Sequence, residues 1–235
     1  YAYIDRVHRV FGPDSPQGEW KSRSHVVQLE APSPLGRVTA YGLLLDLPSA
    51  PTQSSATFGA KLAGARPVAP GRSFTYEFEY ARQTDYGSAP ASFDVDYVAL
   101  SLGLKSGTRS ASVGFERLGG DGRQGFQTPL ATLHAYQGWA DVFLTTPKSG
   151  VRDLNLRAAA TVRPSARLPA VKLQGALHDF ADANGGTSYG READASASVP
   201  LGPHLSAELK AARFDGRSPG FADRSKVWVT LEARY

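Results

Sequence analysis

The sequence predicts an all-β fold, an antiparallel up-and-down transmembrane β-barrel with about twelve strands in this chain. The clearest strand is the last, where Val227, Val229, Leu231 and Ala233 alternate with polar or charged residues. Successive side chains of a strand point to opposite faces, so this strand has one apolar and one charged face. The same pattern recurs along the chain in segments of roughly ten residues, which is typical of strands between lipid and water.

The expected strands follow from this alternation, read between loops rich in Pro, Gly, Asn and Asp. Two less regular strands are expected near residues 1–10 and 24–30. The apolar positions that define the others are, in chain order, Tyr41, Leu43, Leu45 and Leu47; Ala56, Phe58, Ala60 and Leu62; Phe74, Tyr76, Phe78 and Tyr80; Val98, Leu100, Leu102 and Leu104; Ala111, Val113 and Phe115; Leu154, Leu156, Ala158, Ala160 and Val162; Val171, Leu173, Gly175 and Leu177; Ala193, Ala195, Ala197 and Val199; Leu205, Ala207, Leu209 and Ala211; and the last strand.

The connections between these strands alternate in length, which is a second and independent regularity. The short ones are rich in Pro or Gly and span 31–36, 66–71, 105–108, 163–168 and 200–203. Those between them are mostly longer and polar, and span 12–23, 48–54, 83–91, 119–150, 181–190 and 215–223. An up-and-down barrel with short periplasmic turns and long outer loops produces this alternation, whereas a Greek-key sandwich has no reason to sort its loops.

A soluble β-sandwich or a lipocalin-like barrel is the main alternative, and two features weigh against it. Several apolar faces consist of small Ala and Gly, which fill a dry core poorly, and the polar faces carry many ionisable groups, Glu192 and Asp194 among them. In a membrane barrel these groups face a water-filled lumen. The predicted pore-lining residues are Lys61, Glu77, Glu79, Glu116, Arg157, Lys172, Glu208, Lys210, Lys226, Glu232 and Arg234.

Composition excludes several other kinds of protein. The 235 residues show no break in composition, so we expect a single domain over residues 1–235. Cys is absent, and the five His are spread singly, so no metal site, Cys nucleophile or cofactor is expected. The net charge of +4 comes from scattered basic residues, which argues against nucleic-acid binding. No run approaches the ~18 apolar residues of a membrane helix.

The start of the chain reads as the middle of a strand. Residues 1–4, Tyr-Ala-Tyr-Ile, follow no initiator Met and no apolar signal segment. We therefore expect a processed form or a fragment of a longer protein that lacks N-terminal strands. An open sheet edge is not tolerated in hydrocarbon, so the first and last strands must pair with each other or with strands outside this chain.

Loop 119–150 is the longest connection and exceeds the ~12–15 residues beyond which structureless loops tend to be functional or disordered. Its centre, residues 128–144, is too apolar to extend into water. We expect the loop to fold inward or across the mouth as a constriction or plug. His134, Tyr136, Trp139 and Asp141 are the candidates for contacting a solute there. The alternative is that the aromatics only anchor the loop to the barrel wall.

Aromatic residues at predicted strand ends suit an interfacial girdle in a lipid bilayer, and these are Tyr41, Phe74, Tyr80, Phe115 and Phe214. The terminal Tyr235 resembles the aromatic ending that outer-membrane assembly machinery recognises, which implies that machinery as a partner during biogenesis. Catalytic arrangements are scarce. His178 and Asp179 are adjacent, so they point to opposite faces of a strand, and only His134 with Asp141 or Ser149 remains for a rim hydrolase.

Two stretches carry a family resemblance. Residues 1–16 (YAYIDRVHRVFGPDSP) and 125–156 (GFQTPLATLHAYQGWADVFLTTPKSGVRDLNL) resemble the C-terminal part of proteobacterial outer-membrane barrels of the alginate-export porin family. Members of that family are longer, so the resemblance implies part of a larger barrel of about 16–18 strands. It also implies a Gram-negative outer-membrane location. Alginate exporters are expected to have an electropositive conduit, whereas the predicted lining here mixes acidic and basic groups, which argues against alginate as cargo.

The leading functional hypothesis is therefore a passive outer-membrane channel, without enzymatic activity, for small hydrophilic or carbohydrate-like solutes. A second hypothesis is a structural or biogenesis-related barrel whose lumen the long loop closes. A third, with less support, is an outer-membrane hydrolase. The sequence leaves open the solute, its direction, the ion selectivity and the oligomeric state.

Overall fold

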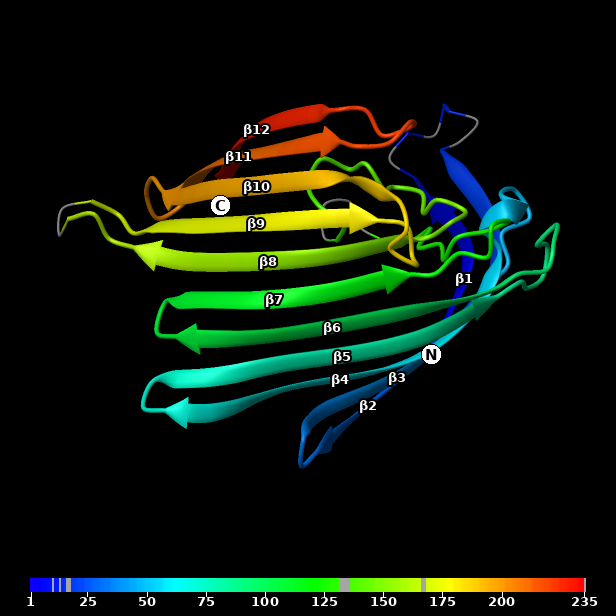
Figure 1. Ribbon diagram of the computed structural model, residues 1–235, viewed down its shortest axis with the longest axis horizontal. Helices are drawn as coiled ribbons and strands as arrows, with labels where there is room; N and C mark the ends of the chain where they lie inside the picture. The colour runs from blue at the N-terminus through cyan, green and yellow to red at the C-terminus, as the bar shows by residue number, and fades with distance from the viewer. Residues whose placement is uncertain (10, 13, 16–17, 132–135, 166–167, 235) are drawn as a thin grey trace.

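The computed structural model describes residues 1–9, 11–12, 14–15, 18–131, 136–165 and 168–234. They form one antiparallel sheet of twelve strands in sequential order, which confirms the predicted up-and-down topology (Figure 1). The strands are β1 (Ala2–His8), β2 (Glu19–Ser33), β3 (Gly36–Leu45), β4 (Ser55–Ala69), β5 (Arg72–Thr84), β6 (Asp94–Ser106), β7 (Arg109–Leu118), β8 (Val151–Val162), β9 (Val171–Ala181), β10 (Ser188–Pro200), β11 (Leu205–Gly216) and β12 (Arg224–Ala233).

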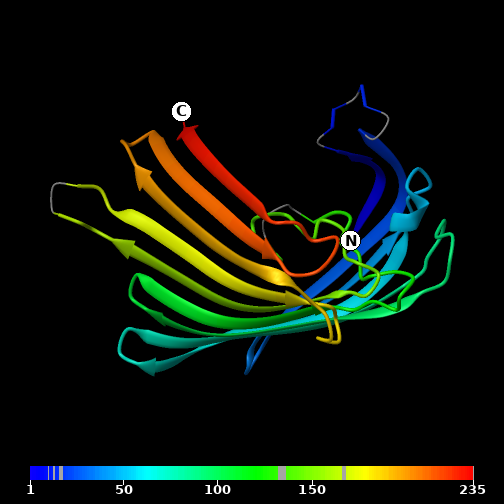
Figure 2. The same cartoon turned by 45° about the horizontal axis from the view of Figure 1, so that its top comes forward.

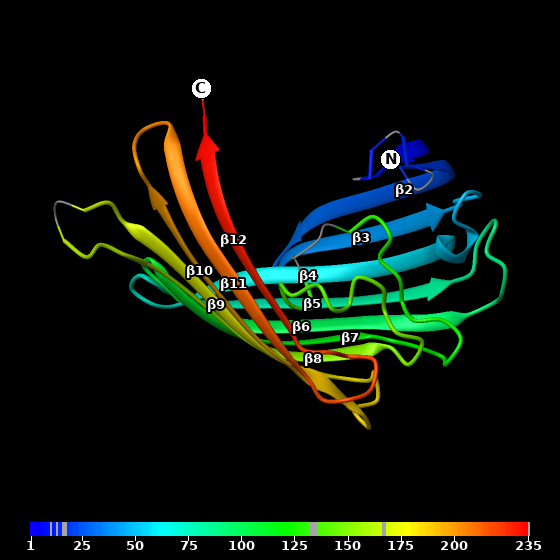
Figure 3. The same cartoon turned by 90° about the horizontal axis from the view of Figure 1, so that it is seen from above.

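The sheet curves into an open trough, with β1 and β12 as its two edges (Figures 2 and 3). Most of the longer connections lie at one end of the strands and the two- to four-residue turns at the other, as the loop pattern predicts (Figure 1). The exception is the connection between β8 and β9, residues 163–170, which lies at the short-turn end but is longer than 182–187 at the other end. The helical element described is the short 3-10 segment Pro51–Gln53 before β4. No helix in the described residues is long and apolar enough to cross a membrane.

The convex face of the trough is apolar and uncovered. Val229 is 76% exposed and Leu209 54% exposed, and they lie opposite each other in the β11–β12 register. Leu156 and Leu177 form an equivalent exposed pair between β8 and β9. A soluble sandwich would cover such residues with a second layer, because burial of apolar area is the main stabilising contribution to its folding. The convex face therefore has the surface expected for contact with lipid.

Strand β3 faces the opposite way from the prediction. Tyr41, Leu43 and Leu45 lie on the concave face, where Tyr41 is opposite Gly59 and donates a hydrogen bond to Glu79 Oε1 at 2.5 Å. The prediction of Tyr41 as a girdle residue is therefore wrong, and so is that of Phe214, which is fully buried against Phe143 inside the trough. Three consecutive leucines make β3 apolar on both faces, so alternation alone cannot assign the inward side. These inward side chains are instead partly covered by the loop between β7 and β8.

Candidate functional site

The described residues of the loop between β7 and β8, 119–131 and 136–150, lie inside the trough (Figures 2 and 3). The loop leaves β7 through a bridge between Gly120 and Gly125, and the Phe126 N–H donates to the Gly119 carbonyl at 2.8 Å. It then crosses the concave face from the β4–β5 wall to the β10–β12 wall, as its contacts show. The prediction that this loop folds inward is confirmed in the described residues.

The first anchor joins the loop to β5 through two glutamines. The Gln83 side chain accepts from the Gln127 N–H at 2.8 Å and donates to the Gln127 carbonyl at 2.9 Å. The Gln83 amide also donates to Thr57 Oγ1 at 2.9 Å. Because Gln83 is only 2% exposed, loss of these bonds would leave buried polar groups without partners. This pairing therefore holds the loop against the β4–β5 wall.

The second anchor joins loop amides to carboxylates of β10. The Ala140 N–H donates to Glu192 Oε1 at 2.7 Å, and the Trp139 N–H donates to Asp194 Oδ2 at 3.2 Å. Gly138 has a φ of +80°, and a Cβ there would lie 2.5 Å from the Glu192 carboxylate. Only glycine permits both this conformation and this close approach. The backbone of the loop is therefore hydrogen-bonded directly to the carboxylates of β10.

The third anchor is formed by cations of β11 and β12. Lys226 Nζ lies 2.5 Å from Asp141 Oδ2, and Arg224 donates to the Asp141 carbonyl at 2.6 Å. Lys210 Nζ lies 4.1 Å from the centre of the Trp139 ring, within cation–π distance. These contacts tie the middle of the loop to the strands at one edge of the sheet.

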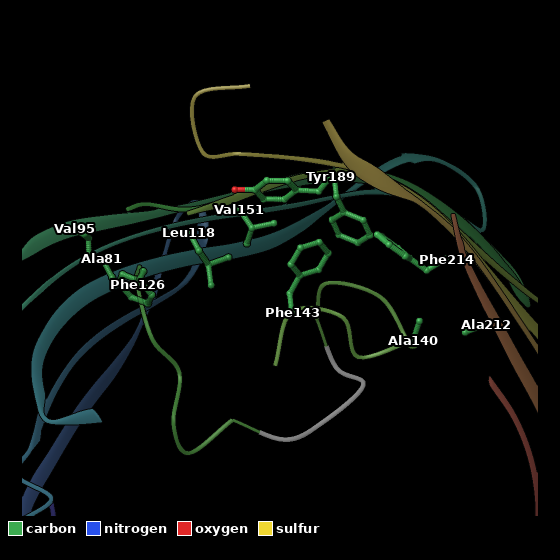
Figure 4. Close-up of a cluster of buried hydrophobic side chains, with 11 residues drawn as sticks. Ala81, Val95, Leu118, Phe126, Ala140, Phe143, Val151, Tyr189, Ala212 and Phe214 are labelled. Atoms are coloured by element: carbon green, nitrogen blue, oxygen red, sulfur yellow. The ribbon is translucent and has the colours of Figure 1, made fainter. Parts of the chain in front are cut away.

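An aromatic cluster completes the attachment (Figure 4). The Phe143 ring lies 4.7 Å from that of Phe180, 5.5 Å from Phe221, 5.9 Å from Tyr189 and 6.1 Å from Phe214, measured between centroids. Phe143 is 7% exposed, although it lies on a loop. The cluster is thus a small hydrophobic core inside the trough, and it explains the apolar composition of the loop.

A cavity of about 540 Å³ lies between the loop and the wall formed by β2 to β7. Its wall includes leucines of β3 together with Phe126 and Leu130 of the loop. Two carboxylates, Glu79 and Glu116, face this space, and each accepts a hydrogen bond from a tyrosine hydroxyl. Gln137 of the loop donates to the second oxygen of Glu116 at 2.6 Å. The cavity therefore combines apolar walls with the carboxylates of Glu79 and Glu116, and its third acidic lining residue, Asp141, is paired with Lys226.

The register places the predicted pore-lining residues on the concave face. Lys61 is opposite Glu79, Glu116 is opposite Asp153, and Lys61 pairs with Glu77 at 2.7 Å. By the same alternation the others on this face are Arg157, Lys172, Glu208, Lys210, Lys226 and Glu232. Arg234 follows β12 and lies 2.9 Å from Glu232. Their contact with a solute stays a prediction.

The four loop candidates separate into different roles. Trp139 and Asp141 anchor the loop, as the preceding contacts show. Tyr136 is 56% exposed and lines the 540 Å³ cavity. His134 lies outside the described residues, and so does Tyr235. Tyr136 is therefore the described candidate whose geometry leaves it available to a solute.

Sequence reasoning missed a buried histidine–carboxylate group. His178 Nδ1 lies 2.8 Å from Asp153 Oδ2 of the neighbouring strand, and its Nε2 lies 3.7 Å from Asp194. Asp179 faces the convex side, where it pairs with Arg191. Asp153 and His178 lie on diagonal positions of β8 and β9, so only the strand register could have brought them together. Their side chains are 0% and 2% exposed, so the pair is sealed from solutes.

In the part of the chain that the structure describes, no group of three or more His, Cys, Asp or Glu residues is placed to hold a metal ion. The buried pair of His178 and Asp153 also lacks a neighbouring nucleophile among its hydrogen-bond partners. The pair is a buried, hydrogen-bonded part of the concave wall.

No family model and no curated protein matches the sequence. Several solved structures do match. The outer membrane protein OprD from Pseudomonas aeruginosa matches with a TM-score of 0.65 and 12% sequence identity, and the match covers 92% of this chain and 58% of that one. OccAB2 from Acinetobacter baumannii has TM-score 0.64 and 14% identity over 92% and 53%. OccK11 (OpdR) from Pseudomonas aeruginosa has TM-score 0.65 and 17% identity over 92% and 59%.

These likenesses show that the chain has the fold of an outer-membrane β-barrel. The chain spans just over half the length of each of these three proteins. The matching structures are OprD and Occ proteins, so the comparisons support a barrel of the outer-membrane type and do not support the alginate-export family in particular.

Proposed function

We propose that this chain forms part of a Gram-negative outer-membrane channel that passes small hydrophilic solutes, with loop 119–150 as its constriction. The observation that carries the proposal is the combination of an apolar, uncovered convex face with a charged concave face that holds the loop. A passive channel needs a water-filled lumen and a narrow point where charge and width select the solute. The anchored loop supplies that narrow point, and the barrel fold supports the location.

The open edges β1 and β12 support the involvement of further strands. An unpaired N–H or C=O in hydrocarbon costs several kcal/mol, so the edges of a barrel in a bilayer are paired. The matched proteins are longer than this chain, which fits a barrel completed by strands outside residues 1–235. The complete lumen would then be enclosed by both sets of strands.

The solute class rests on the lining of the concave face. Glu79 and Glu116 border the cavity beside the loop, while Lys210 and Lys226 lie on the facing wall. Charges of both signs favour polar solutes that carry several hydrogen-bonding groups, including saccharides. Kinship with alginate exporters and recognition of Tyr235 by assembly machinery remain hypotheses from sequence resemblance. We propose no enzymatic activity, because the described histidine–carboxylate pair is buried.

A closed barrel with a structural or biogenesis role is the second candidate, and the many loop anchors favour it. Planar-bilayer recordings of the intact protein separate the two, together with a variant that replaces residues 128–144 by a short Gly-Ser linker. The channel proposal expects current from the wild type and a larger unitary conductance from the variant. Current from the variant alone would show a closed lumen, and no current from either folded protein would refute the channel.

A further inference from the structure

Five arginines form a row on the convex face, at the end of the strands that carries the longer loops. They define the arginine row: Arg82 of β5, Arg117 of β7, Arg152 of β8, Arg191 of β10 and Arg213 of β11. Alternation places them on the same face as the exposed apolar residues, since Arg117 follows Phe115 by two positions and Arg152 precedes Leu154 by two. The row thus lies at the boundary between the apolar surface and the loops.

Most of the arginine row is neutralised by aspartates of the same face and by Asp223 of the connection between β11 and β12. The ion pairs are Arg82 with Asp94, Arg117 with Asp96 at 2.7 Å, Arg191 with Asp179 at 2.7 Å, and Arg213 with Asp215 at 2.9 Å and Asp223 at 3.0 Å. Such partly exposed pairs contribute little to stability by themselves. Their effect is to hold the guanidinium groups in fixed positions beside the apolar surface.

Arg152 differs from the rest of the row. No carboxylate of the described residues lies within ion-pair distance of it, and its Nε is buried without a hydrogen-bond partner. In the β7–β8 register it lies directly opposite Arg117, and its neighbour on β9 is Ala181. Like charges directly opposite each other in a sheet are destabilising. The pair of Arg117 and Arg152 therefore has one uncompensated positive charge, which an anion would neutralise.

The loop between β9 and β10, which contains Gly185, leaves room for the Arg152 guanidinium. Gly185 has a φ of +77°, and a Cβ there would lie 2.5 Å from Arg152 Nη1. The Arg117 Nε–H donates to the Ala183 carbonyl at 2.9 Å, which fixes the second guanidinium. Guanidinium groups present several N–H donors in a planar fork that matches phosphate oxygens. Both groups are thus positioned at the level where lipid headgroups would meet the protein.

From this geometry we propose that the Arg117–Arg152 pair binds a phosphate group of a lipid headgroup in the leaflet on the long-loop side. The inference rests on the proposed membrane location, because only a surrounding bilayer brings headgroups to this face. Asp96 and the Ala183 carbonyl hold the Arg117 guanidinium in place, and the apolar band below receives the acyl chains of the same lipid. Charge complementarity favours an anionic headgroup over a zwitterionic one.

The test titrates the purified intact protein in neutral detergent with lipid A, with lipid A stripped of its phosphates, and with inorganic phosphate, and follows the melting temperature. Lipid A should raise the melting temperature of the wild type, and the other two probes should not. The variant carrying Arg117→Gln and Arg152→Gln should need an about tenfold higher lipid A concentration for a half-maximal rise in melting temperature, as expected for the loss of charged hydrogen bonds. Arg152→Lys keeps the positive charge but loses the planar guanidinium, so its half-maximal lipid A concentration should lie between those of the wild type and the double variant.

Arg109→Gln is the matched control, since Arg109 lies on the same face of β7 at the short-turn end, opposite Ala160. It should bind lipid A like the wild type. Equal binding by the double variant and the wild type would overturn the proposal, and so would an equal effect of phosphate-free lipid or inorganic phosphate. Conductance is measured on the same samples, so lipid binding without current would refute the channel while leaving this site intact.

Discussion

Release of the loop from its aromatic cluster is the most direct test of the constriction. Phe143→Ala removes a ring that is 7% exposed and packed among four aromatic side chains. Truncation of a buried Phe costs about 3–5 kcal/mol. Because ~1.4 kcal/mol changes an equilibrium constant tenfold, a loss of even ~3 kcal/mol of packing energy lowers the equilibrium constant for docking of this half of the loop by about 100-fold.

The assay combines single-channel conductance with limited proteolysis of the intact protein. Phe143→Ala should raise the unitary conductance and expose residues 136–150 to cleavage, whereas the barrel strands stay protected. The neighbouring Leu144→Ala is the control, because Leu144 is 61% exposed and its truncation leaves no cavity. If the two variants give the same conductance and the same cleavage rate, the cluster does not hold the loop and the reasoning is refuted.

Three further outcomes are expected. Replacement of both Glu79 and Glu116 by Gln should lower the cation-over-anion permeability ratio. A unit charge ~8 Å from the ion in water changes the permeability of a cation and of an anion about twofold in opposite directions, so the ratio should fall by about sixfold per charge. An unchanged reversal potential would place these groups away from the conduction path. Val229→Arg should cost about 2–4 kcal/mol of folding in a bilayer if Val229 lies near the midplane, measured by urea titration in lipid vesicles; a change below ~0.5 kcal/mol would contradict lipid contact. At Asp182, burial raises the pKa of the carboxyl, but N–H donors that include Thr187 outweigh this effect and hold the pKa below its usual value. The carboxylate therefore stabilises the loop between β9 and β10 fully at pH values above the usual aspartate pKa. This stabilisation is lost as the pH falls through the lowered pKa. Amide exchange at Thr187, corrected for the intrinsic rate, should show protection at neutral pH that Asp182→Asn removes, and equal protection in both proteins would contradict it.

The strands and their order were predictable because they follow from local alternation. The β11 and β12 positions Leu209 and Val229 face outward as predicted, and the long loop begins and ends at the predicted residues. The orientation of β3 was not predictable in the same way. Leu43 to Leu45 are apolar on both faces, so the inward side depends on the loop that covers it, which is distant in the sequence.

The candidate site was predictable only in part. The inward position of the ionisable residues follows from the alternation of side chains between the two faces of each strand. The apolar centre of loop 119–150 predicts that the loop does not extend into water. The partners of each group could not be derived, because Asp141 meets Lys226 and Ala140 meets Glu192 across dozens of residues. Trp139 was a candidate for contact with a solute, with anchoring of the loop as the alternative, and its packing on Lys210 favours the anchoring role.

The sequence by itself determined that this protein is a meander of two-faced strands with one long inward loop, because alternation and loop composition are local properties of the chain. Only the tertiary structure decided which polar groups meet. His178 with Asp153 and Arg117 opposite Arg152 depend on strand register. A shift of one residue between strands would exchange the faces and separate these pairs, and a shift of two would separate them on the same face. The chemistry of the lumen and of the lipid-facing boundary is therefore a property of the assembled sheet.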